Sequence, residues 1–137
     1  MAIEPYLFFN GRCDEAIAFY RDALGAEVQM LMRFRENPDP PPPGMLPPDW
    51  GDKVMHASLR IGDATLIASD AMCSDSARFS GVTLSLAVPD SAAAHKAFDA
   101  LAVGGTVTMP IARTFWSPCF GMLNDRFGVA WMVNALT

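Results

Sequence analysis

His56 is the most prominent chemistry-bearing side chain in this 137-residue sequence, which contains only two histidines. It lies in an alternating run in which His56, Ser58 and Arg60 share one side of an expected strand, opposite the apolar side chains. An imidazole can act as an acid, a base or a hydrogen-bonding group near neutral pH, so His56 is the candidate catalytic residue. A lone histidine is more often a structural group. His95 falls in an expected helix, where we expect it to be exposed.

Aromatic side chains concentrate in the stretch 114–134, which reads TFWSPCFGMLNDRFGVAWMVN. Asp125 to Gly128 supplies residues typical of a hairpin turn, and an apolar run of strand length, Val129 to Ala135, follows. Most of these aromatic residues are typical of core or subunit packing. Trp116 lies beside a Ser-Pro pair in an irregular part of the stretch, so we expect it to be the aromatic wall of a binding pocket.

Composition excludes several classes of function. Ten Lys and Arg against fifteen Asp and Glu give a net charge of −5, which disfavours nucleic acid or an anionic membrane as a partner. A hydrophobic content of 51% with a mean hydropathy of +0.19 is high for a free monomer and indicates a homodimer. No run approaches the ~20 apolar residues of a membrane span, and the start MAIEPYLFF has no export signal, so we expect a cytoplasmic protein.

The cysteines favour neither a disulfide framework nor a zinc site. They are odd in number and lack C-x-x-C spacing, which is typical of ordinary reduced thiols: Cys13, Cys73 and Cys119. No His or basic residue adjoins Cys119 to lower its pKa, so the sequence gives little support to a nucleophilic role.

Hydrophobic periodicity predicts the elements of the first half. A strand over 3–9 ends at a turn, and a helix with one apolar face follows and stops at Gly25. From Glu27 the period changes to two, which predicts a half-buried strand with Leu31 as the exception. Two further strands are expected as a hairpin, at 54–61 and 64–69, followed by a polar connection over 70–80.

A proline-rich loop interrupts this half at 37–50. Seven prolines between Pro38 and Pro48 remove the N–H donors that a helix or a strand ladder needs. A surface linker is the plainer interpretation of this loop, and a flap over a pocket or an arm onto a partner subunit is the functional one.

The second half repeats the first. A shift of 79 residues aligns Phe19 with Phe98 and Gly25 with Gly104, which predicts a strand over 81–88 and a helix over 91–102. A shift of 66 residues aligns the strand at Leu66 with the strand at Met132. We therefore expect two modules of strand, helix and three strands, over about 1–70 and 79–137, with a glycine in left-handed conformation after each helix.

These residues resemble a known family. The duplicated βαβββ unit looks like the vicinal oxygen chelate superfamily, which includes glyoxalase I, extradiol dioxygenases and bleomycin-resistance proteins. The motifs PYLFFNGRCDEAIAFYRDALGAE, HASLRIGDATLIASDAM and the aromatic stretch above resemble its PhnB-like branch over nearly the whole chain. The resemblance implies a single α+β glyoxalase-like domain over 1–137, with two curved mixed sheets around a pocket, and a homodimer.

The resemblance also implies a divalent metal, held by His, Gln or Glu at one position in the first and last strand of each module. The residues found at those positions are Pro5, Ala68, Thr83 and Met132. Only the threonine hydroxyl offers even a weak ligand, so we expect no metal at these positions and no other cofactor. A divalent metal would need relocated ligands.

The implied fold would turn a small set of polar and aromatic side chains toward the pocket. These expected ligand-binding residues are His56, Ser58, Thr83, Ser85 and Trp116. They favour a metal-independent protein that binds a small organic molecule. The alternative is a lyase, isomerase or dioxygenase of the superfamily that uses relocated ligands. Methyltransferase chemistry, a label sometimes given to PhnB-like proteins, is not expected because no G-x-G-x-x-G follows a strand.

Overall fold

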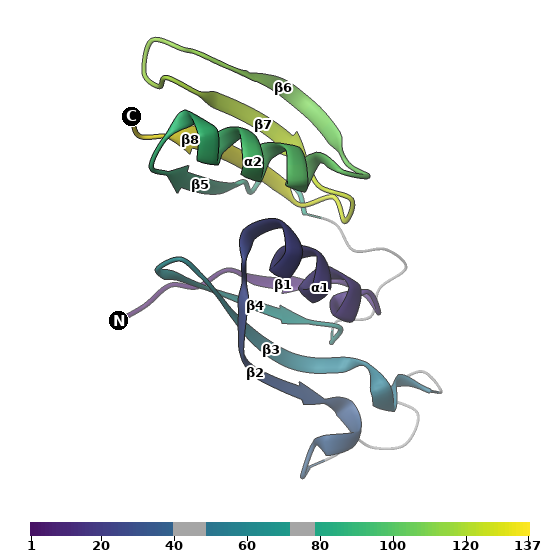
Figure 1. Ribbon diagram of the computed structural model, residues 1–137. Helices are drawn as coiled ribbons and strands as arrows, with labels where there is room; N and C mark the ends of the chain where they lie inside the picture. The colour runs from purple at the N-terminus through teal and green to yellow at the C-terminus, as the bar shows by residue number, and fades with distance from the viewer. Residues whose placement is uncertain (40–48, 72–78) are drawn as a thin grey trace. The chain divides into compact units, whose positions relative to one another are not determined.

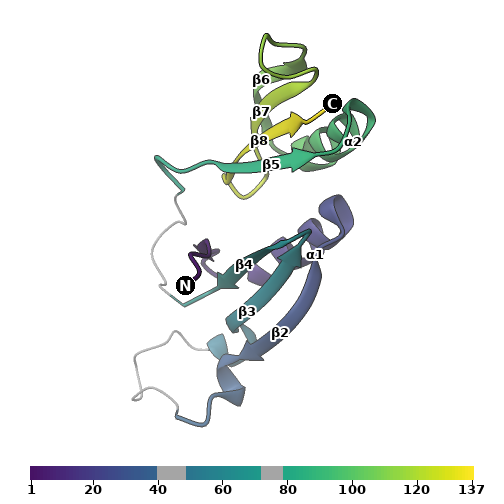
Figure 2. The ribbon, with the colours of Figure 1, turned by 90° about the vertical axis from the view of Figure 1, so that its left-hand side faces the viewer.

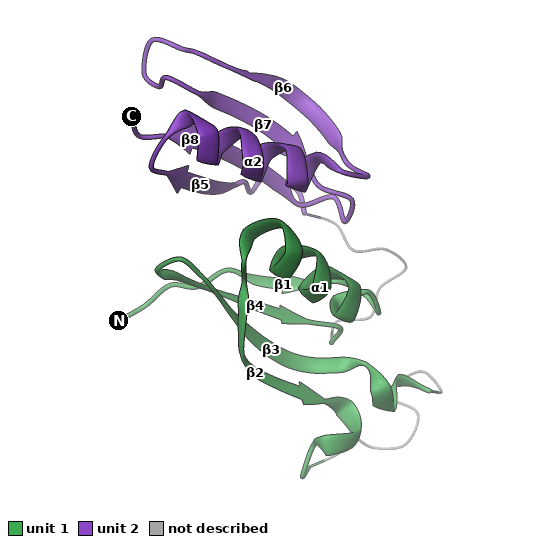
Figure 3. Cartoon of the chain, in the orientation of Figure 1, with its two compact units in different colours: residues 1–77 green, residues 78–137 purple. Residues whose placement is uncertain are grey.

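Two copies of one arrangement, a helix lying on one face of a four-stranded sheet, make up the chain (Figure 1). The computed structural model describes residues 1–39, 49–71 and 79–137. The chain divides into two compact units, residues 1–77 and 78–137 (Figure 3). No helix in the described ranges is long and apolar enough to cross a membrane.

Unit 1 forms a mixed sheet with the strand order β1-β4-β3-β2, in which only β1 and β4 run parallel. Its elements are β1 (Tyr6–Phe8), α1 (Cys13–Leu24), β2 (Glu27–Arg33), the short 3-10 helices η1 (Phe34–Glu36) and η2 (Trp50–Asp52), β3 (Val54–Ile61) and β4 (Ala64–Ser69). Figure 2, turned by 90°, shows β2, β3 and β4 side by side.

Unit 2 has the same topology, with the order β5-β8-β7-β6 and only β5 and β8 parallel. Its elements are β5 (Leu84–Val88), α2 (Ser91–Ala102), β6 (Thr106–Ala112), β7 (Phe120–Asn124) and β8 (Ala130–Ala135). The predicted α+β fold of two βαβββ modules is confirmed.

The core of each unit lies between its helix and one face of its sheet. In unit 1, Tyr20 of α1 is fully buried, as are Ala57 and Leu59 of β3. In unit 2, Leu101 of α2 and Val133 of β8 are fully buried. These apolar positions recur every third or fourth residue in the helices and every second residue in the strands, which is why the sequence pattern located the elements.

The two helix ends use glycine in different ways. Gly25 caps α1 in the left-handed conformation, with φ of 67°; its N–H donates to the Arg21 carbonyl at 3.0 Å, and the Ala26 N–H donates to the Tyr20 carbonyl at 3.3 Å. Gly104 also has a positive φ, of 77°, but α2 ends earlier, at an extended Val103. The N–H of Gly105 donates to the Ala102 carbonyl at 2.9 Å, so Gly104 occupies the third position of a turn that requires positive φ.

The expected repeat alignments need correction by one or two residues. Ala94 and Phe98 of α2 are buried where Ala16 and Tyr20 of α1 are, which is a shift of 78 residues rather than 79. Tyr20, and not Phe19, is therefore the counterpart of Phe98.

The shift of 66 residues is also wrong for the last two strands of each unit. Leu66 is buried beneath α1, whereas Met132 is half-buried and alternates with the buried Trp131 and Val133. The position equivalent to Met132 is Ile67, because the buried partners Leu123 and Trp131 of β7 and β8 are one residue farther apart in sequence than the buried partners Leu59 and Leu66 of β3 and β4.

Strand β2 is not half-buried along one side as expected. Val28 and Met30 are 38% and 43% exposed. A β-bulge separates them, so Val28 pairs with Leu59 and Met30 with Ser58, on opposite faces of the sheet. The same bulge places Leu31 opposite the buried Ala57, which explains why Leu31 broke the period-two pattern.

Two predicted strands are shorter in the structure. The strand expected over 3–9 covers Tyr6–Phe8, since Pro5 lacks an N–H, and Ile3 is almost fully exposed. The strand expected over 81–88 covers Leu84–Val88. Most of the proline-rich loop, at 40–48, and most of the polar connection, at 72–78 with Cys73, lie outside the described residues.

Candidate functional site

Each sheet has one face that is turned away from the helix of its own unit, called here the open face. Strand registers and side-chain alternation assign residues to it. Of the expected ligand-binding residues, His56 and Ser58 lie on the open face of unit 1. Ser85 lies on the open face of unit 2, and Thr83, one residue before β5, is exposed.

On unit 1, His56 is paired with Tyr6, which the sequence had not singled out. The Tyr6 hydroxyl lies 3.3 Å from Nδ1 of His56, and the two rings meet edge to face with centroids 5.8 Å apart. Tyr6 also stacks on Phe8 at 5.0 Å. When the hydroxyl donates to Nδ1, the neutral imidazole carries its proton on Nε2 and can donate that proton to a ligand. Tyr6 is 43% exposed, so this pair is accessible.

Methionines and an ion pair complete the open face of unit 1. Met32 is opposite His56 in the register of β2 and β3, and Met30 is opposite Ser58. Farther along β3, the Arg60 guanidinium lies 3.3 Å from the carboxylate of Glu27, with both side chains more than half exposed. This face therefore combines aromatic, thioether and charged groups.

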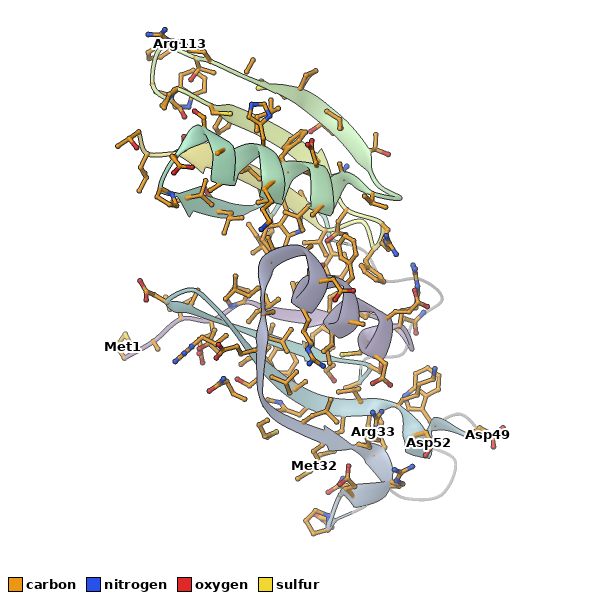
Figure 4. All side chains as sticks on the ribbon, viewed as in Figure 1. Met1, Met32, Arg33, Asp49, Asp52 and Arg113 are labelled. Atoms are coloured by element: carbon orange, nitrogen blue, oxygen red, sulfur yellow. The ribbon has the colours of Figure 1, made fainter. Side chains whose placement is uncertain are left out.

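Arg33, at the end of β2, lies on the opposite side of the sheet from Arg60 of β3. Arg33 follows a second bulge and pairs with Val54, on the helix side of the sheet. Its guanidinium donates to Asp14 of α1 at 2.8 and 3.0 Å and to the Asp52 carbonyl at 2.7 Å. Figure 4 shows Arg33 and Asp52 near each other at the end of β2. The hydrogen bond to Asp14 raises the pKa of Arg33, which therefore serves the fold and is not available as an anion site on the open face.

On unit 2, three methionines form a row across the open face. Met109 of β6 pairs with Met122 of β7, which pairs with Met132 of β8, and Met132 pairs with Ser85 of β5. Thioether side chains are flexible and polarisable, so such a row adapts to the shape of an apolar ligand.

Trp116 is held beside this face by a hydrogen-bonded turn. The Thr114 N–H donates to the Ser117 carbonyl at 2.9 Å, and the Ser117 N–H donates to the Thr114 hydroxyl at 3.0 Å. Ser117 is buried and its hydroxyl bonds the Ala135 carbonyl, which anchors the turn to the end of β8. The Trp116 ring meets Phe120, a residue of the open face, edge to face at 5.4 Å. Because Trp116 is 54% exposed, it offers a flat apolar wall.

Asn134 adds a polar atom that has no partner in the described part of the protein. It lies on the open face of β8, opposite Phe120 of β7 and Ala87 of β5. Its Oδ1 is buried and accepts no hydrogen bond from any described residue. Leaving a buried acceptor unpaired costs about 1–3 kcal/mol, so a donor that reached this oxygen would be favoured.

Unit 2 differs from unit 1 in carrying no charge on its open face. Within the described strands β5 to β8, the side chains assigned to this face include no titratable group. They are Thr83, Ser85, Ala87, Thr106, Met109, Ala112, Phe120, Met122, Asn124, Ala130, Met132 and Asn134.

The residues present do not fit the divalent metal of the superfamily. Across residues 1–39, 49–71 and 79–137, no three His, Cys, Asp or Glu side chains come together in a way that could hold a metal ion. The expected ligand positions also do not fall on equivalent faces of the two sheets, because Ala68 is 1% exposed beneath α1 whereas Met132 lies on the open face of its own sheet. Aliphatic and thioether side chains are poor partners for a hard or borderline cation.

The buried acids serve the fold. Asp70 accepts hydrogen bonds from the N–H groups of Gly11, Cys13 and Val54 at 2.7, 3.0 and 3.2 Å. Burial raises the pKa of the Asp70 carboxyl, while those N–H groups and the Lys53 ammonium oppose the rise.

Asp125 has the same kind of role in the turn that joins β7 and β8. Its carboxylate accepts from the N–H groups of Phe127 and Val129 and from Nε1 of Trp131, at 2.9, 3.1 and 2.9 Å. These contacts show that Asp70 and Asp125 each hold a connecting segment in place through backbone N–H groups.

Neither described cysteine supports nucleophilic chemistry. Cys13 is fully buried, and burial together with the nearby Asp70 carboxylate raises the pKa of its thiol. Cys119 is also buried. His95 is exposed on α2, as expected from the sequence.

Sequence reasoning missed Tyr6 and Asn134. Tyr6 looked like one apolar residue of a strand, and only the parallel pairing of β1 with β4 brings its hydroxyl to His56. Asn134 interrupts the apolar run from Val129 to Ala135, and that interruption was the available signal.

Comparison with known proteins agrees with this architecture. Residues 2–133 match the model of the glyoxalase/bleomycin resistance protein/dioxygenase superfamily, and the chain belongs to this superfamily. Protein YjdN of Escherichia coli (strain K12) is 39% identical over 99% of the chain and 96% of that protein. Protein PA1353 from Pseudomonas aeruginosa has a crystal structure with a TM-score of 0.85 and 44% identity, covering 98% of this chain and 97% of that one.

A third solved structure shares the fold of the chain. It comes from Bacillus cereus and is described as a putative 3-demethylubiquinone-9 3-methyltransferase, PhnB protein. It has a TM-score of 0.80 and 24% identity, covering 98% of this chain and 99% of that chain. At this identity the likeness concerns the fold.

Proposed function

We propose that the protein binds a small organic molecule on its open faces without the divalent metal of the superfamily. The observation that carries the proposal is the composition of these faces: aromatic and thioether side chains surround a few hydrogen-bonding groups, and no three-ligand donor set accompanies them in the described residues. Binding sites for small molecules have this composition, in which apolar walls supply affinity and few polar groups orient the ligand.

Two residues have distinct expected roles. The His56 imidazole, oriented by Tyr6, would hydrogen-bond a polar group of the ligand. Trp116 would offer a flat surface, and its exposure means that truncation should cost the fold little. Ser58 of β3, and Thr83 and Ser85 near the start of β5, would supply further hydroxyl groups to the ligand.

The test combines metal analysis with ligand screening. Untagged protein is dialysed, its zinc, nickel, iron and manganese content is measured, and a library of organic compounds is then screened by thermal shift. We expect less than a tenth of an equivalent of metal, about the level of adventitious binding, and compounds that stabilise the metal-free protein. Stoichiometric metal that survives dialysis would overturn the proposal and favour an enzyme with relocated ligands.

Variants then locate the site. A hit that binds the open face of unit 1 should bind His56→Ala about tenfold more weakly, and a hit that binds the open face of unit 2 should bind Trp116→Ala about tenfold more weakly, the equivalent of one lost hydrogen-bonding or aromatic contact. His95→Ala, an exposed histidine on α2, is the matched control and should bind as the wild type does. Equal affinity for all four proteins would contradict the assignment.

We also propose a homodimer. Large apolar side chains are exposed on the edge strands β2 and β6, with Val107 and Met109 of β6 at 44% and 41%, and Phe115 is 97% exposed. Such residues favour association with a second copy. Light scattering at micromolar concentration should give about twice the chain mass of 14.8 kDa, and a clean monomer over a wide concentration range would refute this.

A further inference from the structure

We propose that the open face of unit 2 recognises a neutral, flat molecule through a hydrogen-bond donor that Asn134 accepts, with the exposed Trp116, supported by the buried Phe120, as the aromatic wall. This inference rests on the proposed function and specifies one chemical class of ligand for one face. Asn134 is then a specificity-determining residue.

The unpaired oxygen of Asn134 is the first argument. Its Oδ1 is buried, and no described residue donates to it. A buried acceptor without a donor is costly, and it gains a full hydrogen bond when a ligand supplies an N–H or O–H group. A ligand that carries only acceptors would leave the oxygen unpaired and gain nothing from it.

The surroundings of Asn134 specify the rest of the ligand. Phe120 of β7 is the strand partner of Asn134, and the centroids of the Trp116 and Phe120 rings are 5.4 Å apart. The partner of Asn134 on the other side is Ala87 of β5, whose methyl side chain takes up little space beside the carboxamide. Aromatic edges and faces beside a small residue suit a planar ring system.

The electrostatics of the face select against ions. The strand positions that form this face within 79–137 carry no titratable side chain, so an anion or a cation would lose its hydration without a partner. The carboxamide oxygen also repels an anion directly. A neutral heteroaromatic with one N–H donor satisfies all three conditions.

Indole and two of its methyl derivatives, 1-methylindole and 3-methylindole, provide the test. Indole and 3-methylindole keep the ring N–H, whereas 1-methylindole has the same added methyl group but no donor. Isotope-labelled full-length protein is titrated with each probe, and NMR shifts of Asn134, Trp116 and Ser85 report binding to the face. We expect 1-methylindole to bind about threefold to tenfold more weakly than 3-methylindole, the worth of one hydrogen bond between neutral groups.

The variant Asn134→Leu keeps the branched shape of the side chain, with two methyl groups in place of the amide oxygen and nitrogen, and removes the acceptor. It should bind both methyl isomers with equal affinity, and Asn134→Ala should do the same if the leucine variant fails to fold. Thr106→Ala, at the exposed start of β6, is the control and should keep the preference for 3-methylindole.

Three results would overturn the inference: equal affinity of the wild type for the two isomers, a preference that survives in the Asn134 variants, or no shift on this face with any indole. Probes that shift only Tyr6 and His56 would remove this inference and leave the proposed function standing. A screen in which no organic compound binds either face would remove both.

Discussion

The two units share a scaffold but differ in the polar groups that they place on it. Both have a helix over a four-stranded sheet of the same order, with a β-bulge at the same place in β2 and β6. Their open faces differ, because unit 1 presents the Tyr6–His56 pair and an Arg60–Glu27 ion pair, whereas unit 2 presents methionines and an amide. The apolar residues beneath the helices determine the fold, and the open faces can vary without changing it.

The largest expected effect separates the two faces of the sheet. Ala68→Glu would bury a charge beneath α1, where Ala68 is 1% exposed, and should lower the free energy of unfolding by at least about 3 kcal/mol. Met132→Glu, on the half-buried open face of β8, should cost about 1 kcal/mol. Urea unfolding measures both. Ile67→Glu, the neighbour of Ala68 on the open face, is the control, and a cost as large as that of Ala68→Glu would show that the faces are misassigned.

The buried acid of unit 2 should have the next largest effect. Asp125→Ala removes the acceptor of three hydrogen bonds and leaves three buried donors unpaired, so it should destabilise the protein by about 3 kcal/mol. The exposed helix cap Asp90, which accepts one bond from Ala93, offers a comparison, and Asp90→Ala should cost about 1 kcal/mol. Similar losses for the two variants would contradict a structural role for Asp125 in the turn.

The buried acid of unit 1 should show a dependence on pH. Asp70→Asn places an amide NH2 group against at least one backbone N–H donor and should cost about 2 kcal/mol. Because the folded-state pKa of Asp70 is raised above 3.8, the folded protein binds this proton more tightly than the unfolded chain does. The contribution of the wild-type carboxyl is therefore largest below pH 3.8 and declines as the pH rises through the folded pKa.

The measurement is the difference in unfolding free energy between wild type and Asp70→Asn at several pH values, which cancels the other carboxylates. The wild-type advantage should shrink as the pH rises above 3.8. An advantage that grows over this range would mean that the N–H donors outweigh burial and that the pKa is lowered.

The smallest expected effects come from the two helix ends. Gly25→Val should cost about 1 kcal/mol, since the left-handed backbone alone disfavours a side chain and no atom lies within 4 Å of the new Cβ. Gly104→Val should cost about 2 kcal/mol, because its Cβ would also meet Cβ and Nε of Arg126 at 3.3 Å. Melting temperatures measure the order, and an equal or reversed order would show that Arg126 moves aside freely.

The elements of the fold were predictable from the sequence because periodicity records burial. The helix over 91–102 was predicted with the observed bounds, and the strand over 64–69 likewise. The bulge in β2 was not predictable, since an extra residue in one strand is defined by its partner strand. It changed the faces of Val28 and Met30 and so reversed part of the expected burial.

The candidate site was predictable only in part. His56 and Ser58 were placed on one side of β3 by alternation, and the structure keeps them there. Tyr6 could not be recognised, because its contact with His56 spans 50 residues of sequence. The expected equivalence of Ala68 and Met132 failed because the chain from Leu123 to its partner Trp131 is one residue longer than the chain from Leu59 to its partner Leu66. A shift of one residue exchanges the two faces of a strand.

The bulges in β2 and β6 also bear on how these sheets end. Each lies on an outer strand, between Val28 and Met30 and between Val107 and Met109, and β6 contains Pro110 as well. A regular strand that approached such an edge would find its donors and acceptors out of step, and at Pro110 no donor at all. The β2 and β6 edges therefore resist extension by a foreign strand, even though apolar side chains are exposed there.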